Sequence, residues 1–371
     1  MIEISLQREK LLGPLQMVVN VVEKRQTLPI LSHILIRGQN DSLIFIGSDV
    51  EMEVHSMVKL DHSNYNGIEF TIPGKKFLDI CRSVAENSTI KITVNDGKAN
   101  VLCGYSRFVM PSFPPREFPL ASMQNREMEV AVSSIDLAKL INKTSFAIPQ
   151  QDVRKYLNGL LFEVKDSTLM ALATDGHRLA MHKVSCATTK DSFAQVIIPK
   201  KAIFALNKIL TPTSQNITLG FNENFINIIG DNCILISKLI SGKFPNYSKI
   251  IPPKGDLELT INCVEIKQAL IRVNILSSEL FRSVQFTIDQ GILTLGANNP
   301  EQEEAVEEIM VDYQKPEVTM TFNISYFLDI LNTIEDDHKV KIFFNDGGGS
   351  VVIEEASNDP DCFYVLMPIR H

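Results

Sequence analysis

The pattern of apolar and polar positions repeats three times along the chain. Each copy begins with an alternating stretch of five or six residues, continues with two or three polar residues, and then becomes an apolar helical segment. Alternation of this length is typical of a half-buried strand, and the wider apolar spacing that follows is typical of an amphipathic helix. The copies are MIEISLQREKLLGPLQMVVNVV from Met1, MEVAVSSIDLAKLINKTSFAI from Met128 and LELTINCVEIKQALIRVNIL from Leu257.

The same layout occurs a second time inside each copy, about 60 to 70 residues later. These second halves are FTIPGKKFLDICRSVAENSTIKITV, VIIPKKAIFALNKILTPTSQNITLGF and MTFNISYFLDILNTIEDDHKVKIFF. Pairs of short alternating segments joined by turn signals fill the remainder. Each copy is therefore predicted to hold about eight short strands and two helices, an α+β arrangement in which sheets bury one face under helices.

The predicted helices cover residues 8–25, 75–86, 134–148, 200–210, 264–276 and 324–334. Pro14 interrupts the first of them, and we expect it near that helix's first turn, where proline is tolerated. Proline-rich joints at residues 110–122 and 242–256 separate the copies. We therefore predict three domains, covering residues 1–125, 126–253 and 254–371.

Composition narrows the class of protein. Apolar residues make up 44% of the chain and charged residues 22%, ordinary values for a folded protein. We expect a cytoplasmic protein, because the start of the chain does not resemble a secretory signal and no apolar run approaches the length of a membrane span. The six cysteines are scattered without zinc-ligand spacing, so we expect neither a metal nor a cofactor.

The charge is unevenly distributed between the predicted elements. The net charge is −8, yet the six predicted helices together carry +7, which leaves −15 for the rest of the chain. Helices that shared one surface would attract phosphate groups there, while the outer surface repelled them. The alternative is that short amphipathic helices simply present lysine and arginine to solvent.

The stretch ATDGHRLA, residues 173–180, raises the question of catalysis because it holds Asp175, His177 and Arg178 within a few residues. Catalytic use requires a nucleophile and an oriented base, and the sequence contains no hydrolase elbow, zincin motif or phosphate loop. It occupies the hairpin position that GSDVEMEV and GANNPEQEEA hold in the other two copies. We therefore interpret it as a structural turn and expect no catalytic residue.

Two other classes of protein remain open. The first is a metal-dependent phosphoesterase that uses Asp175, His177 and Asp49. The second is a repeat scaffold that binds only proteins.

Several strings in register with the repeat point to one family. They are TLPIL, SDVEMEV, QDVRKYLNGLLFEV, ATDGHRLA, FPNYSKIIP, NNPEQEEA and the terminal YVLMPIR. With them the sequence closely resembles, over its full length, the beta subunit of bacterial DNA polymerase III, the replicative sliding clamp. The resemblance implies a homodimer of three-domain chains closed into a six-domain ring around duplex DNA, with two helices per domain on the inner face and antiparallel sheets outside. It also implies a processivity factor that is not itself an enzyme.

The resemblance implies a hydrophobic cleft that captures short peptides from the polymerase III alpha subunit, the clamp loader, and other polymerases and repair proteins. Carried over by position, its residues are Leu157, Thr174, Gly176, His177, Arg178, Leu179, Pro245, Lys249, Ile250, Val365, Leu366, Met367, Pro368, Ile369 and Arg370. Lys249 stands where arginine is expected, and His371 where leucine is common. Leu157 and Met367 also fit an ordinary core role.

Two further surfaces follow from the resemblance, and no membrane contact is expected. Candidate contacts to the DNA backbone are Arg25, Lys75, Gln151, Arg154, Lys200 and Lys201, although a solvated surface position is the alternative for each lysine. Candidate residues of the dimer interface are Lys76, Arg107, Phe108, Met110, Ile275, Leu276, Glu301, Glu303, Glu304 and Glu308. The acidic run in this set could instead be a solvated rim.

Overall fold

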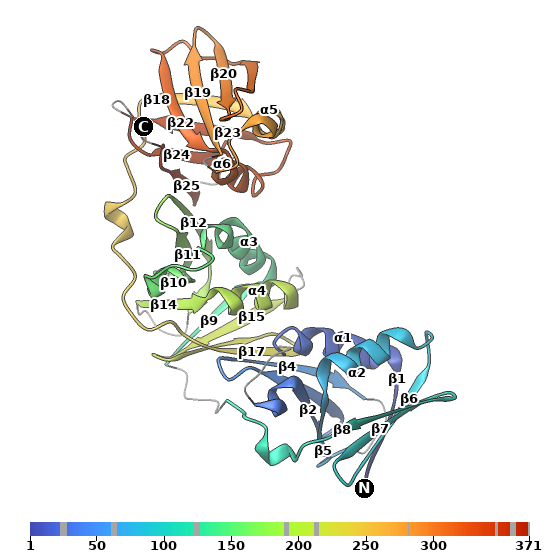
Figure 1. Cartoon of the computed structure of the whole chain (residues 1–371). Coiled ribbons are helices and arrows are strands. Elements are labelled where there is room, and N and C mark those ends of the chain that lie inside the picture. Colours follow the sequence, from blue (N-terminus) through green and yellow to red (C-terminus); the bar gives the residue numbers. More distant parts are fainter. Residues whose placement is uncertain are drawn as a thin grey trace. The chain divides into compact units, whose positions relative to one another are not determined.

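The computed structural model describes residues 1–22, 28–60, 65–121, 127–188, 193–210, 215–280, 282–345, 348–356 and 361–369. Within these ranges the chain forms strands β1 to β25, all paired antiparallel, and six α-helices (Figure 1). Two helices fall in each copy of the sequence repeat, as predicted. Among the described residues, no helix has both the length and the apolar character needed to cross a membrane.

The helices begin where the sequence predicts and end somewhat earlier. They are α1 (Arg8–Val19), α2 (Gly74–Ser83), α3 (Ser134–Thr144), α4 (Lys200–Ile209), α5 (Cys263–Val273) and α6 (Ile324–Leu331). The predicted ends of α3 and α5 are instead short 3-10 turns, Ser145–Ala147 and Asn274–Leu276. The expectation for Pro14 was wrong, because it lies in the interior of α1 and not in the first turn. Burial of Leu11, Leu15, Val18 and Val19 stabilises this helix despite the hydrogen bond that proline cannot donate.

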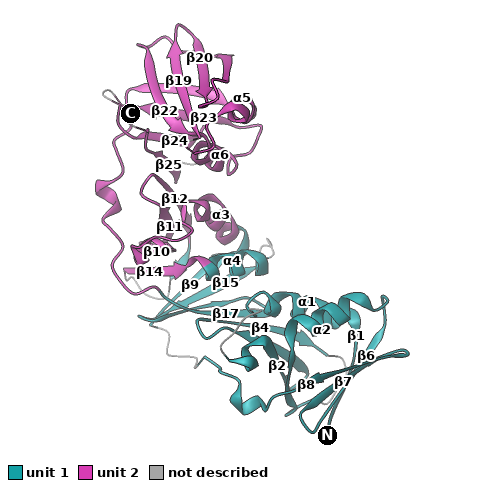
Figure 2. Cartoon of the chain, viewed as in Figure 1, with its two compact units in different colours: residues 1–135, 186–191, 201–239 teal, residues 136–185, 192–200, 240–371 magenta. Residues whose placement is uncertain are grey.

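The chain forms two compact units that do not follow the repeat (Figure 2). Unit 1 comprises residues 1–135, 186–191 and 201–239, and unit 2 comprises residues 136–185, 192–200 and 240–371. The units differ from the repeat because each of the two large sheets contains strands from two copies of the repeat. The predicted division into domains 1–125, 126–253 and 254–371 stays a prediction.

Unit 1 contains two sheets. Sheet A has the order β1-β6-β7-β8, and sheet B has the order β13-β9-β15-β16-β17-β4-β3-β2-β5. Helix α1 packs on β3, β4 and the neighbouring helix α2. The strands of the unit are β1 (Ile2–Gln7), β2 (His33–Gln39), β3 (Ser42–Ser48), β4 (Met52–Lys59), β5 (Glu69–Pro73), β6 (Thr89–Asn95), β7 (Lys98–Cys103), β8 (Ser106–Pro111), β9 (Met128–Ser133), β13 (Ala187–Thr188), β15 (Asn216–Phe221), β16 (Phe225–Ile229) and β17 (Cys233–Lys238).

Unit 2 is built in the same way. Sheet C has the order β14-β10-β11-β12-β25-β24-β23-β18, and sheet D has the order β21-β20-β19-β22. Helix α5 packs on β18, β20 and β21 and on the neighbouring helix α6. The strands are β10 (Gly159–Lys165), β11 (Thr168–Thr174), β12 (Arg178–Ser185), β14 (Ala194–Pro199), β18 (Leu257–Asn262), β19 (Ser283–Asp289), β20 (Ile292–Asn298), β21 (Glu304–Met310), β22 (Val318–Asn323), β23 (Lys339–Phe344), β24 (Val351–Glu355) and β25 (Cys362–Leu366).

One pairing in each large sheet joins two copies of the repeat. In sheet B, β4 pairs with β17 of the next copy, with Met52 opposite Ser237. In sheet C, β12 pairs with β25 of the next copy, with Arg178 opposite Leu366. Strand β21 of the third copy is equivalent to β4 and β12, and β8 of the first copy is equivalent to β17 and β25. Within the described residues neither has such a partner, and each is an end strand of its own sheet.

Candidate functional site

The ATDGHRLA segment forms the tight turn between β11 and β12, and its polar groups hold that turn together. The Asp175 carboxylate accepts the backbone N–H groups of His177 and Arg178 at 2.9 and 3.0 Å. The Thr174 hydroxyl donates to the Arg178 carbonyl at 2.6 Å and accepts the Gly176 N–H at 3.1 Å. Gly176 has a φ of +92°, a left-handed conformation in which a side chain is strained.

Arg178 fixes the turn to the elements around it. Its guanidinium binds the second oxygen of Asp175 at 3.0 Å, Asp329 of α6 at 2.6 Å and the Phe146 carbonyl at 3.0 Å. It also lies over the ring of Tyr326, 4.5 Å from the centroid. Its side chain is only 9% exposed, so its charge is largely desolvated and depends on these partners. Arg178 therefore has a structural role, because it joins the turn to α6 and to the end of the α3 segment.

An open groove of about 710 Å³ lies beside this turn. The His177 ring stacks on the Tyr326 ring at 6.1 Å, and burial raises the pKa of the Tyr326 hydroxyl. The Met367 N–H donates to the His177 carbonyl at 2.9 Å, which holds the C-terminal segment against the turn. The groove is lined by His177, Leu280, Asn323, Tyr326, Ser350, Met367, Pro368 and Ile369.

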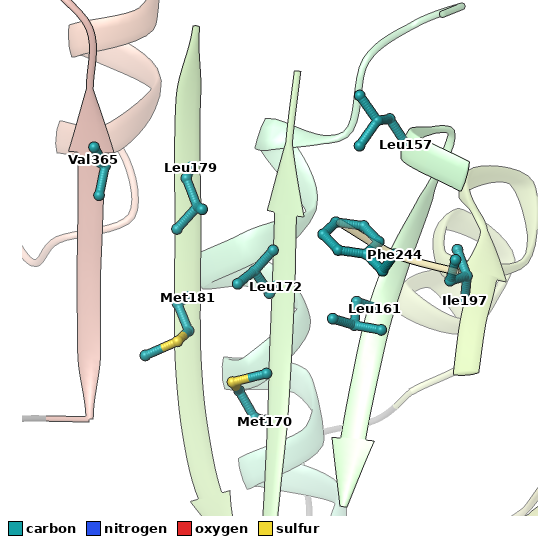
Figure 3. Packing of buried hydrophobic residues seen from close by; sticks show 9 residues of the cluster. All are labelled: Leu157, Leu161, Met170, Leu172, Leu179, Met181, Ile197, Phe244 and Val365. Atoms are coloured by element: carbon teal, nitrogen blue, oxygen red, sulfur yellow. The ribbon is translucent and has the colours of Figure 1, made fainter. Parts of the chain in front are cut away.

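Below the turn, one face of sheet C carries a buried apolar cluster (Figure 3). Leu179 of β12 lies directly opposite Val365 of β25, and Leu172 of β11 lies directly opposite Met181 of β12. Phe244, from the segment that crosses this face, covers the cluster and is 5% exposed. The remaining members are Leu157, Leu161, Met170 and Ile197.

The structure brings the expected cleft residues into one region of unit 2, in two layers. Leu157, Thr174, Leu179, Val365 and Leu366 are buried, so Leu157 has the core role considered above. Met367 is 39% exposed and lines the groove. The more exposed members are Gly176, His177, Pro245, Lys249, Ile250, Pro368 and Ile369, with Arg178 between the layers, and Arg370 lies outside the described residues.

The sequence reasoning missed part of the groove wall. Asn323, Tyr326 and Ser350 belong to the third copy of the repeat, and Leu280 is 82% exposed in the loop before β19. Asn323 could have been predicted as a helix N-cap, and its side chain accepts the N–H of Tyr326 at 3.2 Å. Its closeness to a turn more than 140 residues earlier in the chain has no local signal.

The expected DNA contacts are split between the units, and several are engaged within the chain. Lys201 of unit 1 is paired with Asp49, and Lys75 is half-buried. In unit 2, the Lys200 ammonium donates to the carbonyls of Ile148 and Pro149 at 2.9 and 3.1 Å. Burial lowers the pKa of Lys200. Arg25 lies outside the described residues.

The loop of residues 149–154 presents the other two candidates. Gln151 is exposed. Arg154 binds the Asp152 carboxylate through two nitrogens, at 3.0 and 2.8 Å, and these hydrogen bonds lower the pKa of Asp152 to about 2. Arg154 also reaches the Asp175 carbonyl at 3.4 Å, so this loop contacts the β11–β12 turn.

Apart from Lys76 of α2, the expected interface residues lie on or near β8 and β21, the end strands of their sheets. In unit 1, Lys76 and Arg107 are exposed, Phe108 is half-buried and Met110 is only 6% exposed. In unit 2, Ile275 is 75% exposed, Leu276 is half-buried, and Glu301, Glu303, Glu304 and Glu308 are exposed. Alternation along the same strands exposes three apolar side chains that the sequence reasoning missed, Val109, Val306 and Met310.

The turn geometry gives no support to metal-dependent hydrolysis. Both Asp175 oxygens already accept hydrogen bonds inside the turn, and Asp49 accepts the N–H groups of Glu51 and Met52 in the β3–β4 turn of unit 1. Among the described residues, Glu335, Asp337 and His338 form one group with metal-ligand spacing. It lies on the loop after α6, where His338 is bound to Glu355.

Comparison with known proteins shows which family has this architecture. Profiles described as the N-terminal, central and C-terminal domains of the DNA polymerase III beta subunit match residues 2–122, 131–246 and 248–370. The chain is 39% identical to the beta sliding clamp of Pseudomonas putida and 37% identical to that of Escherichia coli K12, each over 366 residues and 99% of both chains. It is also similar to the crystal structure of the DNA polymerase III subunit beta from Pseudomonas aeruginosa, with a TM-score of 0.94, 38% identity and full coverage of both chains.

The fold is that of a three-domain sliding clamp, built from antiparallel sheets and few helices. The chain belongs to the DNA polymerase III beta subunit family. It is a non-catalytic processivity factor, and the phosphoesterase hypothesis has no support. The resemblance inferred from the sequence strings is confirmed.

Proposed function

We propose that two copies of this chain close into a ring around duplex DNA and tether polymerases to it through the groove beside the β11–β12 turn. The groove carries the proposal, because it joins an adaptable apolar wall to a turn held rigid by Asp175 and Arg178. A ring is retained on DNA by topology, so weak contacts suffice and allow sliding. A cytoplasmic location is part of this proposal, and the role of the family in bacterial DNA replication supports it.

The groove suits a short peptide that presents a few apolar side chains. Met367 and Leu280 provide flexible apolar walls, and His177 and Tyr326 provide aromatic faces with polar edges. Each well-buried apolar anchor contributes roughly 1.5 to 3 kcal/mol. A few anchors, after the cost of ordering the peptide, correspond to a dissociation constant on the order of 1 μM. At this affinity the clamp loader, the alpha subunit and repair polymerases can exchange at one site.

The pairing rule of the repeat supports a specific way of closing the ring. Strands β4 and β12 each pair with the third strand after the second helix of the next copy, β17 or β25. Strand β21 is the equivalent of β4 and β12, and β8 is the equivalent of β17 and β25. Pairing β21 with the β8 of a second copy therefore continues the same sheet and covers two open edges.

Equivalent positions in the repeat also predict the register in which β21 and β8 would pair. By position in the repeat, Glu303 is equivalent to Met52 and Arg178. Met110 is equivalent to Ser237 and Leu366 in the same way. Glu304 then lies opposite Val109 of the second copy, and Val306 lies opposite Arg107. In this register, acidic residues of β21 lie on both sides of Arg107 of the second copy. Exposed ion pairs of this kind add little affinity, so their main effect is to orient the two copies and to match the basic end of one chain with the acidic end of the other.

The candidate DNA contacts have two roles. Gln151 and Lys75 offer their polar groups to phosphate oxygens. Lys200 and Arg154 instead hold the loop of residues 149–154 in place, since each is engaged with that loop. Lys201 combines its Asp49 pair with exposure of nearly half of its side chain. Sequence-independent binding follows, because phosphate contacts carry no base information.

A topological assay tests the whole function. The protein is loaded onto nicked circular DNA by a clamp loader and followed by gel filtration. We expect co-elution with the circle and release after a single cut that linearises it. Loss from the intact circle at the same rate as from the linear form would favour a scaffold that binds only proteins.

A further inference from the structure

We propose that a second pocket of unit 2 binds an arginine side chain in the segment that flanks a partner's apolar peptide. The pocket has a volume of about 550 Å³ and lies along sheet C from the peptide groove. This inference rests on the proposed function of the groove. The pocket would recognise a residue of the partner that lies outside the apolar anchors bound in the groove.

The floor of the pocket continues the apolar face below the turn without a break. Two residues beyond Leu179 on β12 is Met181, and two residues before Leu172 on β11 is Met170, so each pair points to the same face (Figure 3). Met181 lies directly opposite Phe363 of β25. Met170 and Met181 are 4% and 6% exposed, and both line the pocket. The groove and the pocket therefore lie at opposite ends of the same pair of strands, β12 and β25, so a peptide that leaves the groove in the direction of these strands reaches the pocket.

The segment after Phe244 forms the opposite wall. Tyr247, Ser248 and Ile251 line the pocket, and Tyr247 and Ile251 also pack against the buried cluster. The 3-10 turn Tyr247–Lys249 holds this wall, since the Asn246 side chain accepts the Ser248 N–H at 3.2 Å. The pocket thus has a flat apolar floor with an aromatic wall, a shape that suits a long aliphatic stem.

A carboxylate stands at the end of this apolar surface. Glu163 of β10 lies directly opposite Met170, and one of its oxygens accepts hydrogen bonds from the Tyr247 hydroxyl at 2.9 Å and the Gln195 amide at 2.6 Å. Both donors are neutral, so they orient the carboxylate without cancelling its charge. Burial, followed by this hydrogen bond, raises the pKa of Tyr247 to about 12, which keeps the hydroxyl a donor.

The other charges of the lining leave the pocket slightly anionic. Lys165 and Asp166 lie 3.9 Å apart at the exposed rim, and Lys183 and Asp361 are joined through their backbones. With Glu163, the lining holds three carboxylates and two ammonium groups. An arginine fits this pattern best, because its stem covers the methionines, its plane stacks on an aromatic ring and its guanidinium binds a carboxylate with two donors.

The test uses three fluorescein-labelled synthetic peptides with the same apolar anchors, Leu, Leu and Phe. Each carries at both ends a Gly-Xaa-Gly extension in which Xaa is Arg, Met or Glu. Fluorescence anisotropy with the full-length protein should give the Arg peptide about five- to tenfold higher affinity than the Met peptide, as for a partly exposed charge-assisted contact. The Glu peptide should bind more weakly than both.

Two variants separate the pocket from the groove. Glu163→Gln keeps the hydrogen-bond acceptor for Tyr247 and should remove the preference for Arg while leaving the affinity for the Met peptide unchanged. Met367→Ala, which changes no charge, should weaken all three peptides equally. Equal binding of the Arg and Met peptides by the unaltered protein, or an Arg preference that survives Glu163→Gln, overturns the pocket alone. Failure of all three peptides to bind the unaltered protein overturns the groove and, with it, the pocket.

Discussion

Val50 and Gly176 occupy equivalent positions in two turns of the repeat, and both have left-handed backbone conformations, with φ values of +77° and +92°. The turns share their hydrogen bonds. The Val50 N–H donates to the Ser48 hydroxyl at 3.3 Å, as the Gly176 N–H donates to Thr174, and Asp49 and Asp175 each accept two backbone N–H groups. The repeat therefore preserves a turn whose strained position holds glycine in one copy and a β-branched residue in the other.

Replacing Val50 with glycine should stabilise unit 1. The left-handed conformation costs an L-residue roughly 1 to 2 kcal/mol, while glycine loses about 0.5 to 1 kcal/mol of extra entropy on folding. We expect Val50→Gly to raise the free energy of unfolding by about 0.5 to 1 kcal/mol in urea titrations. Gly176→Val should have the opposite sign and a larger size, because a Cβ at Gly176 would also lie 3.2 Å from an Arg154 nitrogen.

Removing Arg178 should damage both stability and peptide capture. Arg178→Ala removes the guanidinium from the second oxygen of Asp175 and from the Phe146 carbonyl in a largely desolvated place, which costs about 2 to 3 kcal/mol. His177→Ala is the matched control, since His177 is exposed and its removal should change the free energy of unfolding by less than about 0.5 kcal/mol. Similar stability of the two variants would contradict the structural role of Arg178.

Deleting residues 367–371 should abolish peptide capture and preserve the dimer. The deletion removes Met367, Pro368 and Ile369 from the groove wall, and none of these lies on the open strands β8 or β21. Anisotropy with a labelled apolar peptide measures the first effect, and sedimentation equilibrium measures the second. A monomeric deletion variant would count against the proposed interface.

Changing Ile275 and Leu276 together to alanine should weaken the ring. Ile275 is 75% exposed in the single chain, so its apolar surface is available to a second copy. Each large-to-small change in a buried interface costs about 2 to 5 kcal/mol. The dimer dissociation constant should therefore rise at least tenfold in sedimentation experiments, while Ile135→Ala, which alters an exposed isoleucine of α3, should leave it unchanged.

The stability of unit 2 should depend on pH through the interactions of Glu355 with His338 and Lys143. The hydrogen bond to Glu355 is the main cause that raises the pKa of His338 above 6.5. Burial alone would raise the pKa of Glu355, but its hydrogen bonds to Lys143 and His338 outweigh burial and lower it below 4.5. The His338 contribution is thus fully present below pH 6.5 and is lost as the pH rises through its raised value, whereas the Glu355 contribution is lost as the pH falls below 4.5.

Urea unfolding at pH 6 and pH 8.5 tests the His338 part of this prediction. The stability difference between the unaltered protein and His338→Gln should shrink at the higher pH. Glu335→Gln should reduce this pH dependence only slightly, because Glu335 is exposed and its charge is the smallest of the causes that raise the pKa of His338. A difference that stays constant between the two pH values would show that the His338 charge does not contribute.

The repeat, the strands and the helices could be read from the sequence because they depend on local spacing. The starts of α1 to α6 follow the change from alternation to helical spacing, and the turn role of ATDGHRLA followed from its equivalence to the other hairpins. The seven strings also sufficed to identify the family. These are properties of short segments, where side-chain direction is fixed by the backbone period.

Tertiary structure decided which strands pair and which side chains meet. Nothing near Arg178 in the sequence indicates Asp329 or Tyr326. Likewise, Leu157 is a core residue because it lies in a buried cluster with residues distant in the sequence, such as Phe244 and Val365. Strand partners are poorly encoded locally, since backbone ladders are chemically alike and the choice depends on the packing of whole faces. The sequence by itself therefore determined the elements and the family, whereas the groove and the adjoining pocket exist only once β12 and β25 pair.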